Sequence, residues 1–331
     1  MIYPWHQPIW QQLVSHWQRL PHACLLIGRE HTGKTAFARH LAQALLCEHP
    51  SSLHEPCGQC PSCHLFAQDA HPDFYLLTPE QPESGETTAR KLQQIKIDAI
   101  RAILEPLQQT SVRGGRRVVC ISPAESMNVQ AANALLKMLE EPPEAVVFIL
   151  ISHNADRVLP TIRSRCRALL LPPPDAATAL QFWRQAHPES ADQAAPLLAF
   201  HSHAPLFEPQ PEQDQWREQL LQLLAEPRLL AILDYAAQWD KQKLPLAVLL
   251  DWLYKWLLDM LLVSQQQAPL YYPHHQSSLH TVAQKTQPHT LFRLIDHVHR
   301  LSPYGHHSLN VRMQAESLLG EYLLALNPKT R

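Results

Sequence analysis

Two groups of residues in the 331-residue chain have the types and spacing that binding chemistry needs. The first is Gly28–Thr35, which reads GREHTGKT and matches the phosphate-binding pattern G-x-x-x-x-G-K-[ST]. In this pattern backbone N–H groups and the lysine hold phosphate oxygens, and the final hydroxyl binds Mg²⁺. An ordinary glycine-containing turn is the alternative, but the chain has only 8 glycines. The residues expected to bind a nucleotide, ATP with Mg²⁺, are Gly28, Gly33, Lys34 and Thr35.

The second group is a set of four closely spaced cysteines, with the pattern C-x₉-C-x₂-C-x₂-C. Two consecutive C-x-x-C turns can direct thiolates at one tetrahedral Zn²⁺, and the first cysteine can supply the fourth ligand. A redox C-x-x-C pair and a disulfide scaffold are the weaker alternatives. A closed four-thiolate site leaves no position for water, so we expect a structural zinc ion. The expected ligands are Cys47, Cys57, Cys60 and Cys63.

The acids that a hydrolysing phosphate-loop enzyme needs are missing from the expected positions. Such an enzyme places one acid at the end of a neighbouring strand, to hold the water of Mg²⁺, and usually a second to polarise the attacking water. The matching strand is Val118–Ile121, and it is followed by Ser122 and Pro123. Glu125 comes three residues late and is expected to point elsewhere. We therefore predict weak or absent ATPase activity.

Two polar segments further along the chain could act on a phosphate. Ser152 follows the apolar run Phe148–Ile151, where a polar side chain could sense the γ-phosphate. A plain strand-to-loop transition explains this segment equally well. Arginines occupy positions 163, 165 and 167. Such a run is either a solvated surface or the source of one arginine for a phosphate held by another subunit, as in arginine fingers.

The elements that must position these residues follow from the apolar patterning. Apolar β-rich runs alternate with helical periods over residues 22–171, which predicts an α/β fold with a parallel sheet covered on both faces. The predicted strands are 24–27, 74–77, 118–121, 146–151 and 168–171, and the predicted helices lie near 34–46, 95–108 and 127–140. Prolines at 172–174 mark a boundary, a linker is expected over 204–215, and Leu-rich helices follow. The predicted domains are 1–171, 172–208 and 209–331.

Bulk properties restrict the possible partners. With 28 basic and 30 acidic side chains, overall charge gives no case for nucleic-acid binding. The segment Leu244–Val263 is long enough to span a membrane, but Asp251, Lys255 and Asp259 would form one charged stripe along a helix. That stripe suits a core or subunit-interface helix, and the N-terminus resembles neither a signal nor a transit sequence. We therefore expect a soluble, cytoplasmic protein.

The combination of motifs resembles the clamp-loader subunits of bacterial DNA polymerase III, which belong to the AAA+ class. The resemblance rests on the phosphate loop, the cysteines inserted after its helix, the segment Ala131–Pro143, and Ser164-Arg165-Cys166. It covers 1–171 strongly and the remainder only in layout. It implies an α/β AAA+ phosphate-loop domain, a small helical lid and an all-α C-terminal collar domain. It also implies zinc at the four cysteines and a role for Arg165 as an arginine finger in the ATP site of an adjacent motor subunit.

Within this family, several features favour a non-motor subunit over the motor (gamma/tau) subunit. They are the opening Tyr3-Pro4-Trp5, the missing acids, the weak C-terminal similarity, and a lid segment at 202–205 without a sensor arginine. The resemblance then implies a subunit that works with the motor and delta subunits to load the sliding clamp onto primed DNA. The alternatives are an active motor or other AAA+ ATPase, and a nucleic-acid-binding zinc module, which would need a denser basic surround.

Overall fold

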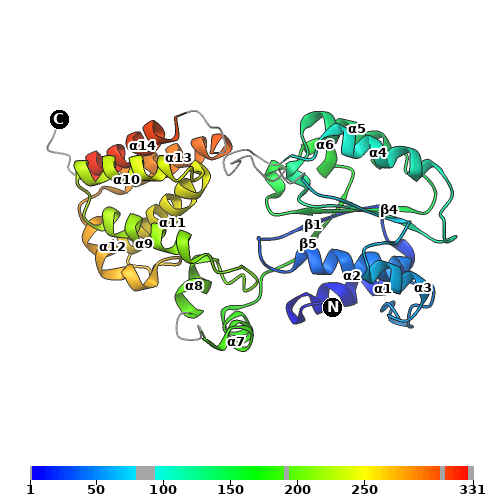
Figure 1. Ribbon diagram of the computed structural model, residues 1–331. Helices are drawn as coiled ribbons and strands as arrows, with labels where there is room; N and C mark the ends of the chain where they lie inside the picture. Colours follow the sequence, from blue (N-terminus) through cyan, green and yellow to red (C-terminus); the bar gives the residue numbers. More distant parts are fainter. Residues whose placement is uncertain (1, 80–93, 190–193, 306–309, 327–331) are drawn as a thin grey trace. The chain divides into compact units, whose positions relative to one another are not determined.

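The structure, a computed structural model, describes residues 2–79, 94–189, 194–305 and 310–326 (Figure 1). Among these residues the chain divides into two compact units. The first unit ends at Asp175, and the second begins at Ala176. Each unit has its own buried apolar core, so each is described by itself.

The first unit is built on a five-stranded parallel sheet with the strand order β2-β3-β4-β1-β5. The strands are β1 (Ala23–Ile27), β2 (Phe74–Leu77), β3 (Arg117–Ile121), β4 (Val146–Ser152) and β5 (Arg167–Leu170). Every residue of β3 and β4 is buried, as expected for central strands of a parallel sheet that is covered on both faces. The predicted strands are confirmed to within one residue at each end, because continuous apolar runs mark them clearly.

Helices cover both faces of this sheet. Figure 1 shows α1 to α3 on one face and α4 to α6 on the other. Their bounds are α1 (Gln7–Ser15), α2 (Lys34–Leu46), α3 (Pro61–Ala67), α4 (Ile97–Gln108), α5 (Val129–Glu140) and α6 (Pro160–Arg163). Successive residues of β1 serve the two cores: Leu26 packs with Phe37 of α2, and Leu25 packs with Leu135 of α5. The α/β fold predicted for this region is therefore confirmed.

Two predicted helices begin two residues later than expected, at Ile97 and Val129. In the second case the reason is a cap. Asn128 has an extended backbone, and its side chain accepts a hydrogen bond from the amide of Ala131 at 2.8 Å. An N-cap residue lies outside the helix although it belongs to the same polar–apolar pattern.

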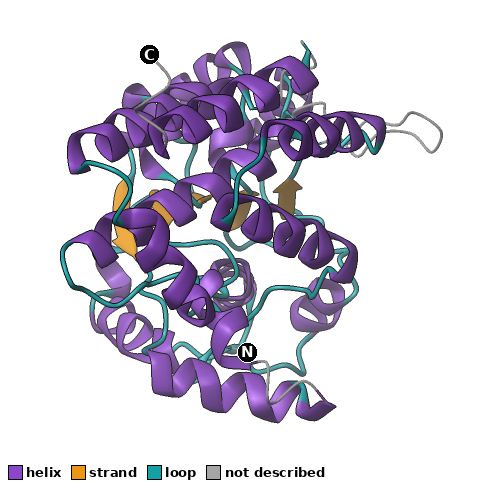
Figure 2. Cartoon of the chain, turned by 90° about the vertical axis from the view of Figure 1, so that its left-hand side faces the viewer, coloured by secondary structure: helices purple, strands orange, loops and turns teal. Residues whose placement is uncertain are grey.

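The second unit is entirely helical in the residues that the structure describes, and Figure 2 turns it toward the viewer. Its helices are α7 (Ala176–Ala186), α8 (Ala194–Phe200), α9 (Pro211–Ala225), α10 (Leu229–Lys241), α11 (Leu246–Ser264), α12 (Gln276–Ala283), α13 (Pro288–Leu301) and α14 (Val311–Leu326). In the main core, Trp256 donates a hydrogen bond to the hydroxyl of Tyr322 at 2.9 Å, and that hydroxyl donates to the carbonyl of Leu224 at 2.8 Å. A smaller cluster forms where Trp183 of α7 stacks on Phe207 at 4.3 Å.

The linker expected over 204–215 is shorter than predicted, because α9 already begins at Pro211. Proline suits the first turn of a helix, where its missing N–H has no partner to lose. The negative charges of Glu212 and Asp214 in the same turn interact favourably with the positive end of the helix dipole. The Pro- and Glu-containing residues from 211 onward therefore form the first turn of α9 and do not belong to the linker.

The charged stripe predicted on α11 is only half present. Lys255 and Asp251 form an ion pair at 2.8 Å, but Asp259 is fully buried. The carboxylate of Asp259 accepts hydrogen bonds from the amides of residues 270–272, at distances between 2.7 and 3.2 Å. Burial raises the pKa of Asp259 although these hydrogen bonds oppose the shift. Among the described residues, no helix combines the length and the apolarity that crossing a membrane requires.

Candidate functional site

The phosphate loop links β1 to α2, and both of its glycines are needed where they stand. Gly33 has a φ of 92°, in the left-handed region that favours glycine, immediately before α2 begins at Lys34. A Cβ added to Gly28 would lie 2.4 Å from the carbonyl oxygen of Leu171. The strand–loop–helix context predicted from the sequence is therefore present, with Thr35 exposed in the first turn of α2.

Lys34 is turned back onto its own loop. Its side chain is 2% exposed, and its ammonium donates a hydrogen bond to the carbonyl of Arg29. Burial lowers the pKa of Lys34 to about 8, while the charges of Glu30 and Glu125 oppose this shift. A phosphate that bound here would take the place of the Arg29 carbonyl as the partner of the ammonium.

The N-terminal segment also holds the loop, which the sequence did not indicate. The indole Nε1 of Trp5 donates a hydrogen bond to the carbonyl of Thr32 at 2.8 Å, and Tyr3 stacks on Trp5 with ring centroids 4.8 Å apart. Thr32 in turn donates from its hydroxyl to the carbonyl of Arg29 at 2.8 Å. The aromatic pair at the start of the chain therefore supports the loop conformation directly.

The strand that lacks the expected acids, β3, does not pair with β1, the strand that leads into the phosphate loop. Sequence reasoning treated the strand ending at Ile121 as a neighbour of the strand before the phosphate loop. In the structure β4 lies between β3 and β1. Ser122 and Pro123 follow β3 as expected, so no carboxylate stands at these two positions.

Glu125 does not point away from this region, as its spacing suggested. Its Oε1 accepts hydrogen bonds from the amides of His153 at 2.8 Å and Asn154 at 3.2 Å, directly after β4. Its charge also acts on Lys34. The chain bends through a short turn at 124–126, and this bend brings a late carboxylate back toward the loop, which spacing alone does not reveal.

Ser152 lies beside the entrance of the phosphate loop. It ends β4, pairs with Ile27 of β1, and its carbonyl accepts a hydrogen bond from the amide of Gly28 at 3.3 Å. Its side chain is fully buried. The structure thus brings Ser152 together with the predicted loop residues.

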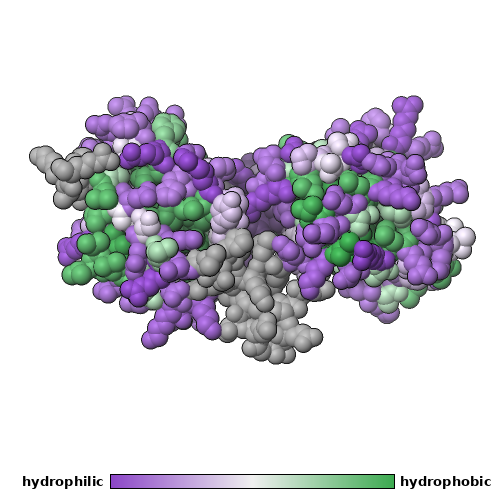
Figure 3. All heavy atoms as spheres, turned by 90° about the horizontal axis from the view of Figure 1, so that it is seen from above, coloured by the Kyte–Doolittle hydropathy of each residue, from purple (hydrophilic) through white to green (hydrophobic). Residues whose placement is uncertain are grey.

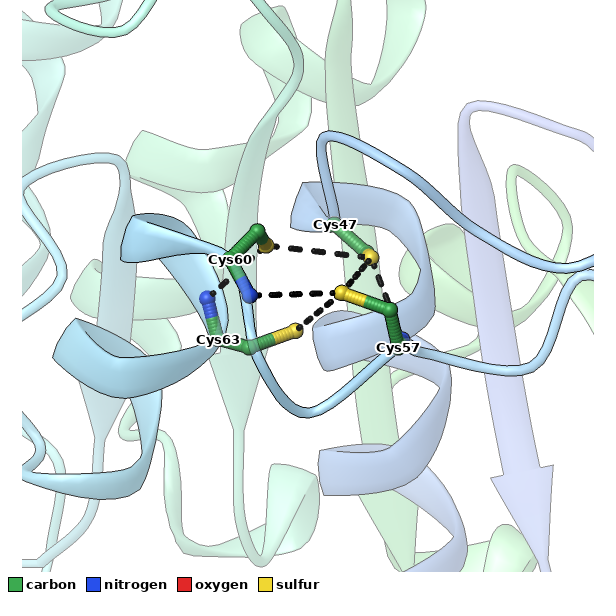
Figure 4. A group of neighbouring side chains, drawn as sticks. All are labelled: Cys47, Cys57, Cys60 and Cys63. Atoms are coloured by element: carbon green, nitrogen blue, oxygen red, sulfur yellow. Dashed lines mark hydrogen bonds between the residues drawn. The ribbon is translucent and has the colours of Figure 1, made fainter.

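The four predicted cysteines converge on one point, as Figure 4 shows. All four sulfur atoms lie within 4.8 Å of one another. The Cys47–Cys57, Cys47–Cys60 and Cys57–Cys63 sulfur pairs are 3.5, 3.9 and 4.0 Å apart. Sulfurs around a tetrahedral ion with Zn–S bonds of about 2.3 Å lie about 3.8 Å apart. The cluster can therefore hold a metal ion.

The backbone around the cysteines is arranged to stabilise thiolates. The amides of Cys57, Cys60 and Cys63 point at the sulfurs of Cys47, Cys57 and Cys60, at 3.3, 3.3 and 3.4 Å respectively. Gly58, with a φ of 72°, makes the turn that this arrangement requires. Hydrogen bonds to sulfur favour the ionised form, which is the form that binds metal.

A polar network ties the cysteine cluster to a distant loop. Glu48, next to Cys47, accepts hydrogen bonds from Ser62 at 2.7 Å and from Arg113 at 2.6 Å. These hydrogen bonds lower the pKa of Glu48. The amide of Arg113 in turn donates to the buried carboxylate of Asp73 at 3.1 Å. No sequence spacing indicated this network, since its members come from separate parts of the chain.

Arg165 lies between α6 and β5, far from the phosphate loop of its own chain. Its Nε donates to Glu140 at 2.7 Å, its Nη2 pairs with the same carboxylate, and its Nη1 donates to the carbonyl of Thr161 at 3.0 Å. Glu140 ends α5, so two motifs behind the family resemblance meet here. Arg165 precedes β5, whereas the loop follows the neighbouring parallel strand β1, so the two lie at opposite ends of these strands.

Comparisons with known proteins agree with this architecture. The family model described as "DNA polymerase III, delta subunit" matches residues 5–175. The chain is 41% identical to "DNA polymerase III subunit delta'" of Pseudomonas aeruginosa, over 78% of this chain and 77% of the relative. It is 36% identical to the Escherichia coli protein of the same name, over 67% of this chain and 65% of the relative.

A third relative, "DNA polymerase III subunit delta'" of Haemophilus influenzae, is 30% identical over 78% of this chain and 77% of its own length. Among solved structures, a DNA polymerase III gamma subunit-related protein of Thermotoga maritima covers 96% of this chain and 99% of its own, with 16% identity. The TM-score is 0.44. All three of these sequence relatives are named as delta-prime subunits. The chain therefore belongs to the delta-prime family of DNA polymerase III clamp-loader subunits.

Proposed function

We propose that the chain acts as a non-motor subunit that supplies Arg165 to the ATP site of a neighbouring motor subunit. The position of Arg165 carries this proposal. Arg165 lies before the N-terminal end of β5, whereas the phosphate loop follows the C-terminal end of the neighbouring strand β1, and its side chain is 34% exposed. A planar guanidinium offers paired N–H donors that match phosphate oxygens, so it suits a phosphate presented by another subunit.

The working assembly would contain motor (gamma/tau) and delta subunits, and it would place the sliding clamp on primed DNA. Exposed apolar side chains of the second unit support binding to other subunits. They are Leu229 and Leu230 of α10, Phe292 of α13, and Met313 and Leu324 of α14. Figure 3 shows hydrophobic surface on this unit. A replication role in bacteria would place the protein in the cytoplasm.

The chain's own phosphate loop would bind ATP with Mg²⁺ but hydrolyse it slowly or not at all. Gly28 fits closely beside the carbonyl of Leu171 and Gly33 adopts a left-handed conformation, so the loop can take the turn in which backbone N–H groups face phosphates, and Lys34 provides the charge. Thr35 would offer its hydroxyl to the metal ion. Ser122 and Pro123 cannot replace the acids that polarise water.

A structural zinc ion would occupy the four-cysteine cluster formed by Cys47, Cys57, Cys60 and Cys63. The sulfur separations fit a tetrahedral ion, and four thiolates leave no open position for chemistry. Zinc at this point would link the end of α2 to the start of α3. The three proposed domains remain 1–171, 172–208 and 209–331, and the separate apolar cluster around Trp183 supports a distinct lid.

The test is an alanine substitution at Arg165 in a complex reconstituted from the chain with motor and delta subunits. An arginine finger accelerates phosphoryl transfer by about 10³-fold or more at the site it enters. In the presence of clamp and primed DNA, the complex with Arg165→Ala should therefore hydrolyse ATP more slowly than the wild-type complex. The loss should equal the fraction of the total rate that the one affected ATP site contributes. Arg163→Ala is the matched control, since Arg163 is more exposed and pairs with Asp156 instead.

Two outcomes would contradict the proposal in different ways. Unchanged hydrolysis by the Arg165→Ala complex would remove the finger role. Rapid, DNA-stimulated hydrolysis by the isolated chain would favour the alternative of an active motor. Circular dichroism of each variant would show that the substituted chain remains folded.

A further inference from the structure

Three buried polar atoms around the phosphate loop have no hydrogen-bond partner among the described residues. They are Oε2 of Glu125, Oγ of Ser152 and Nδ1 of His153. Buried polar atoms in folded proteins are almost always partnered, and an unpartnered one costs about 1–3 kcal/mol. A polar ligand bound beside the loop would give these three atoms partners.

The hydrogen bonds of the backbone place these atoms in one neighbourhood. Glu125 Oε1 is bound to the amide of His153 at 2.8 Å, and Ser152 is the residue before it. The carbonyl of Ser152 accepts from the amide of Gly28, the first residue of the phosphate loop. A continuous set of contacts therefore runs from Glu125 through the end of β4 to the loop.

Charge interactions agree with this placement. The negative charges of Glu30 and Glu125 act to raise the pKa of Lys34, against the effect of burial. Burial lowers the pKa of His153, and the charge of Lys34 lowers it further, while Glu30 and Glu125 act in the opposite direction. Glu125, Lys34 and His153 thus share one electrostatic environment, with Lys34 almost fully buried within it.

We propose that Glu125 supplies the carboxylate of the nucleotide site, in place of the acids missing at positions 122 and 123. Two amides fix Oε1, so the free Oε2 is held in one orientation and can accept a hydrogen bond from water on the Mg²⁺ of bound ATP. This inference rests on the proposed binding of ATP by the chain. It gives Glu125 a role in binding Mg²⁺ with ATP and none in polarising an attacking water, because its one free oxygen accepts the hydrogen bond from the metal-bound water.

The experiment measures the affinity of the purified full-length chain for ATP with Mg²⁺ and for ATP with EDTA, by isothermal titration calorimetry. Hydrogen bonds to charged groups are worth about 1.5–3 kcal/mol, so the wild-type chain should bind ATP with Mg²⁺ about tenfold or more tightly than ATP alone. Glu125→Gln should lower this ratio by about tenfold or more. It should retain affinity for ATP with EDTA and the contact of Thr35 with Mg²⁺. Glu30→Gln is the matched control, because Glu30 is exposed and acts on Lys34 only through its charge.

The outcomes separate this inference from the proposed function. A Glu125→Gln chain that keeps the wild-type preference for Mg²⁺ overturns the role of Glu125 and leaves ATP binding intact. A wild-type chain that binds no ATP in either condition overturns both the inference and the nucleotide site, but leaves Arg165 untouched. Loss of the preference in Glu30→Gln as well would reduce the effect to general charge, and would also overturn the assignment. Thermal melting of each variant establishes that it is folded.

Discussion

The two ends of helix α2 suit ligands of opposite charge, and they differ in whether the groups that would bind the ligand are already in position. At its N-terminal end, partial positive charge and the phosphate loop suit an anion, and at its C-terminal end Cys47 begins a cluster suited to a cation. The cysteine sulfurs already lie at the separations that a metal ion requires. At the other end Lys34 is bound to its own loop, and three neighbouring polar atoms find no partner in the part of the chain that the structure describes. The cysteine end of α2 is therefore preorganised for a metal ion, whereas at the phosphate-loop end a bound phosphate would replace the contact of Lys34 with its own loop.

The largest effect should come from breaking the cysteine cluster with Cys60→Ser. A structural zinc ion contributes on the order of 10 kcal/mol to the folding of isolated zinc fingers. The loss here should be smaller, several kcal/mol, because α2 and α3 also bury Phe37 and Phe66 in the core. The expected results are loss of zinc by mass spectrometry and a melting temperature well below that of the wild-type chain.

A second cysteine provides the control for this substitution. Cys120 is fully buried in β3 and outside the cluster, so Cys120→Ala should lower stability modestly and leave one zinc ion bound. If Cys60→Ser retained a full complement of zinc, the cluster would not be the metal site. If both variants melted alike, the metal would contribute nothing beyond core packing.

An intermediate effect should appear at the other end of α2 when pH is raised. Lys34 has a pKa of about 8 in the free chain, lowered by burial, and only its protonated form attracts phosphate. Affinity for ATP should therefore be full below pH 8 and fall as pH rises through this value, by about tenfold between pH 7 and pH 9. Titration calorimetry across this range would measure the decline.

Lys34→Arg separates the charge of the lysine from other effects of pH. Arginine stays protonated throughout this range, so the affinity of the variant should not change with pH, whatever its absolute value. Zinc content should stay constant in both proteins, because the cysteine cluster does not share this group. A wild-type affinity that was equal at pH 7 and pH 9 would mean that Lys34 is not the titrating partner of the phosphate.

Sequence predicted the cysteine end of α2 better than the nucleotide end, and the reason is chain distance. All four cysteines lie within one short segment, so spacing alone determined which side chains meet. The nucleotide end depends on contacts across 27 residues between Trp5 and Thr32 and across 28 residues between Glu125 and His153. Short-range pattern cannot predict such contacts, because they depend on strand order and on a local bend.

The same distinction holds for the fold. The strands of the sheet were predicted almost to the residue, since short apolar runs leave a strong signal in the sequence, and β3 and β4 are buried throughout. The position of β4 between β3 and β1 was not predicted, because the apolar pattern of a strand does not reveal which strands it pairs with. In the helical unit, Asp259 was assigned to a charged stripe from its spacing, although the fold buries it against the amides of 270–272.

The smallest effect should come from Arg113→Ala, which tests how far preorganisation at the metal end extends beyond the cysteines. Arg113 pairs with Glu48 at 2.6 Å, but both side chains are 31% exposed. Partly exposed ion pairs contribute about 0–1 kcal/mol, so zinc affinity in a chelator competition should fall by about fivefold at most. Glu48 would still accept the hydrogen bond from Ser62, which limits the loss.

Arg101→Ala is the control for this last substitution, because Arg101 forms an exposed pair with Asp98 on α4, outside the network. It should leave zinc affinity unchanged. A loss of about a hundredfold in Arg113→Ala would place Arg113 among the outer groups that tune metal sites strongly, and would extend the preorganised region to the loop at 111–113. No loss at all would confine preorganisation to the cysteines and their own amides, because the network would then contribute nothing to zinc affinity.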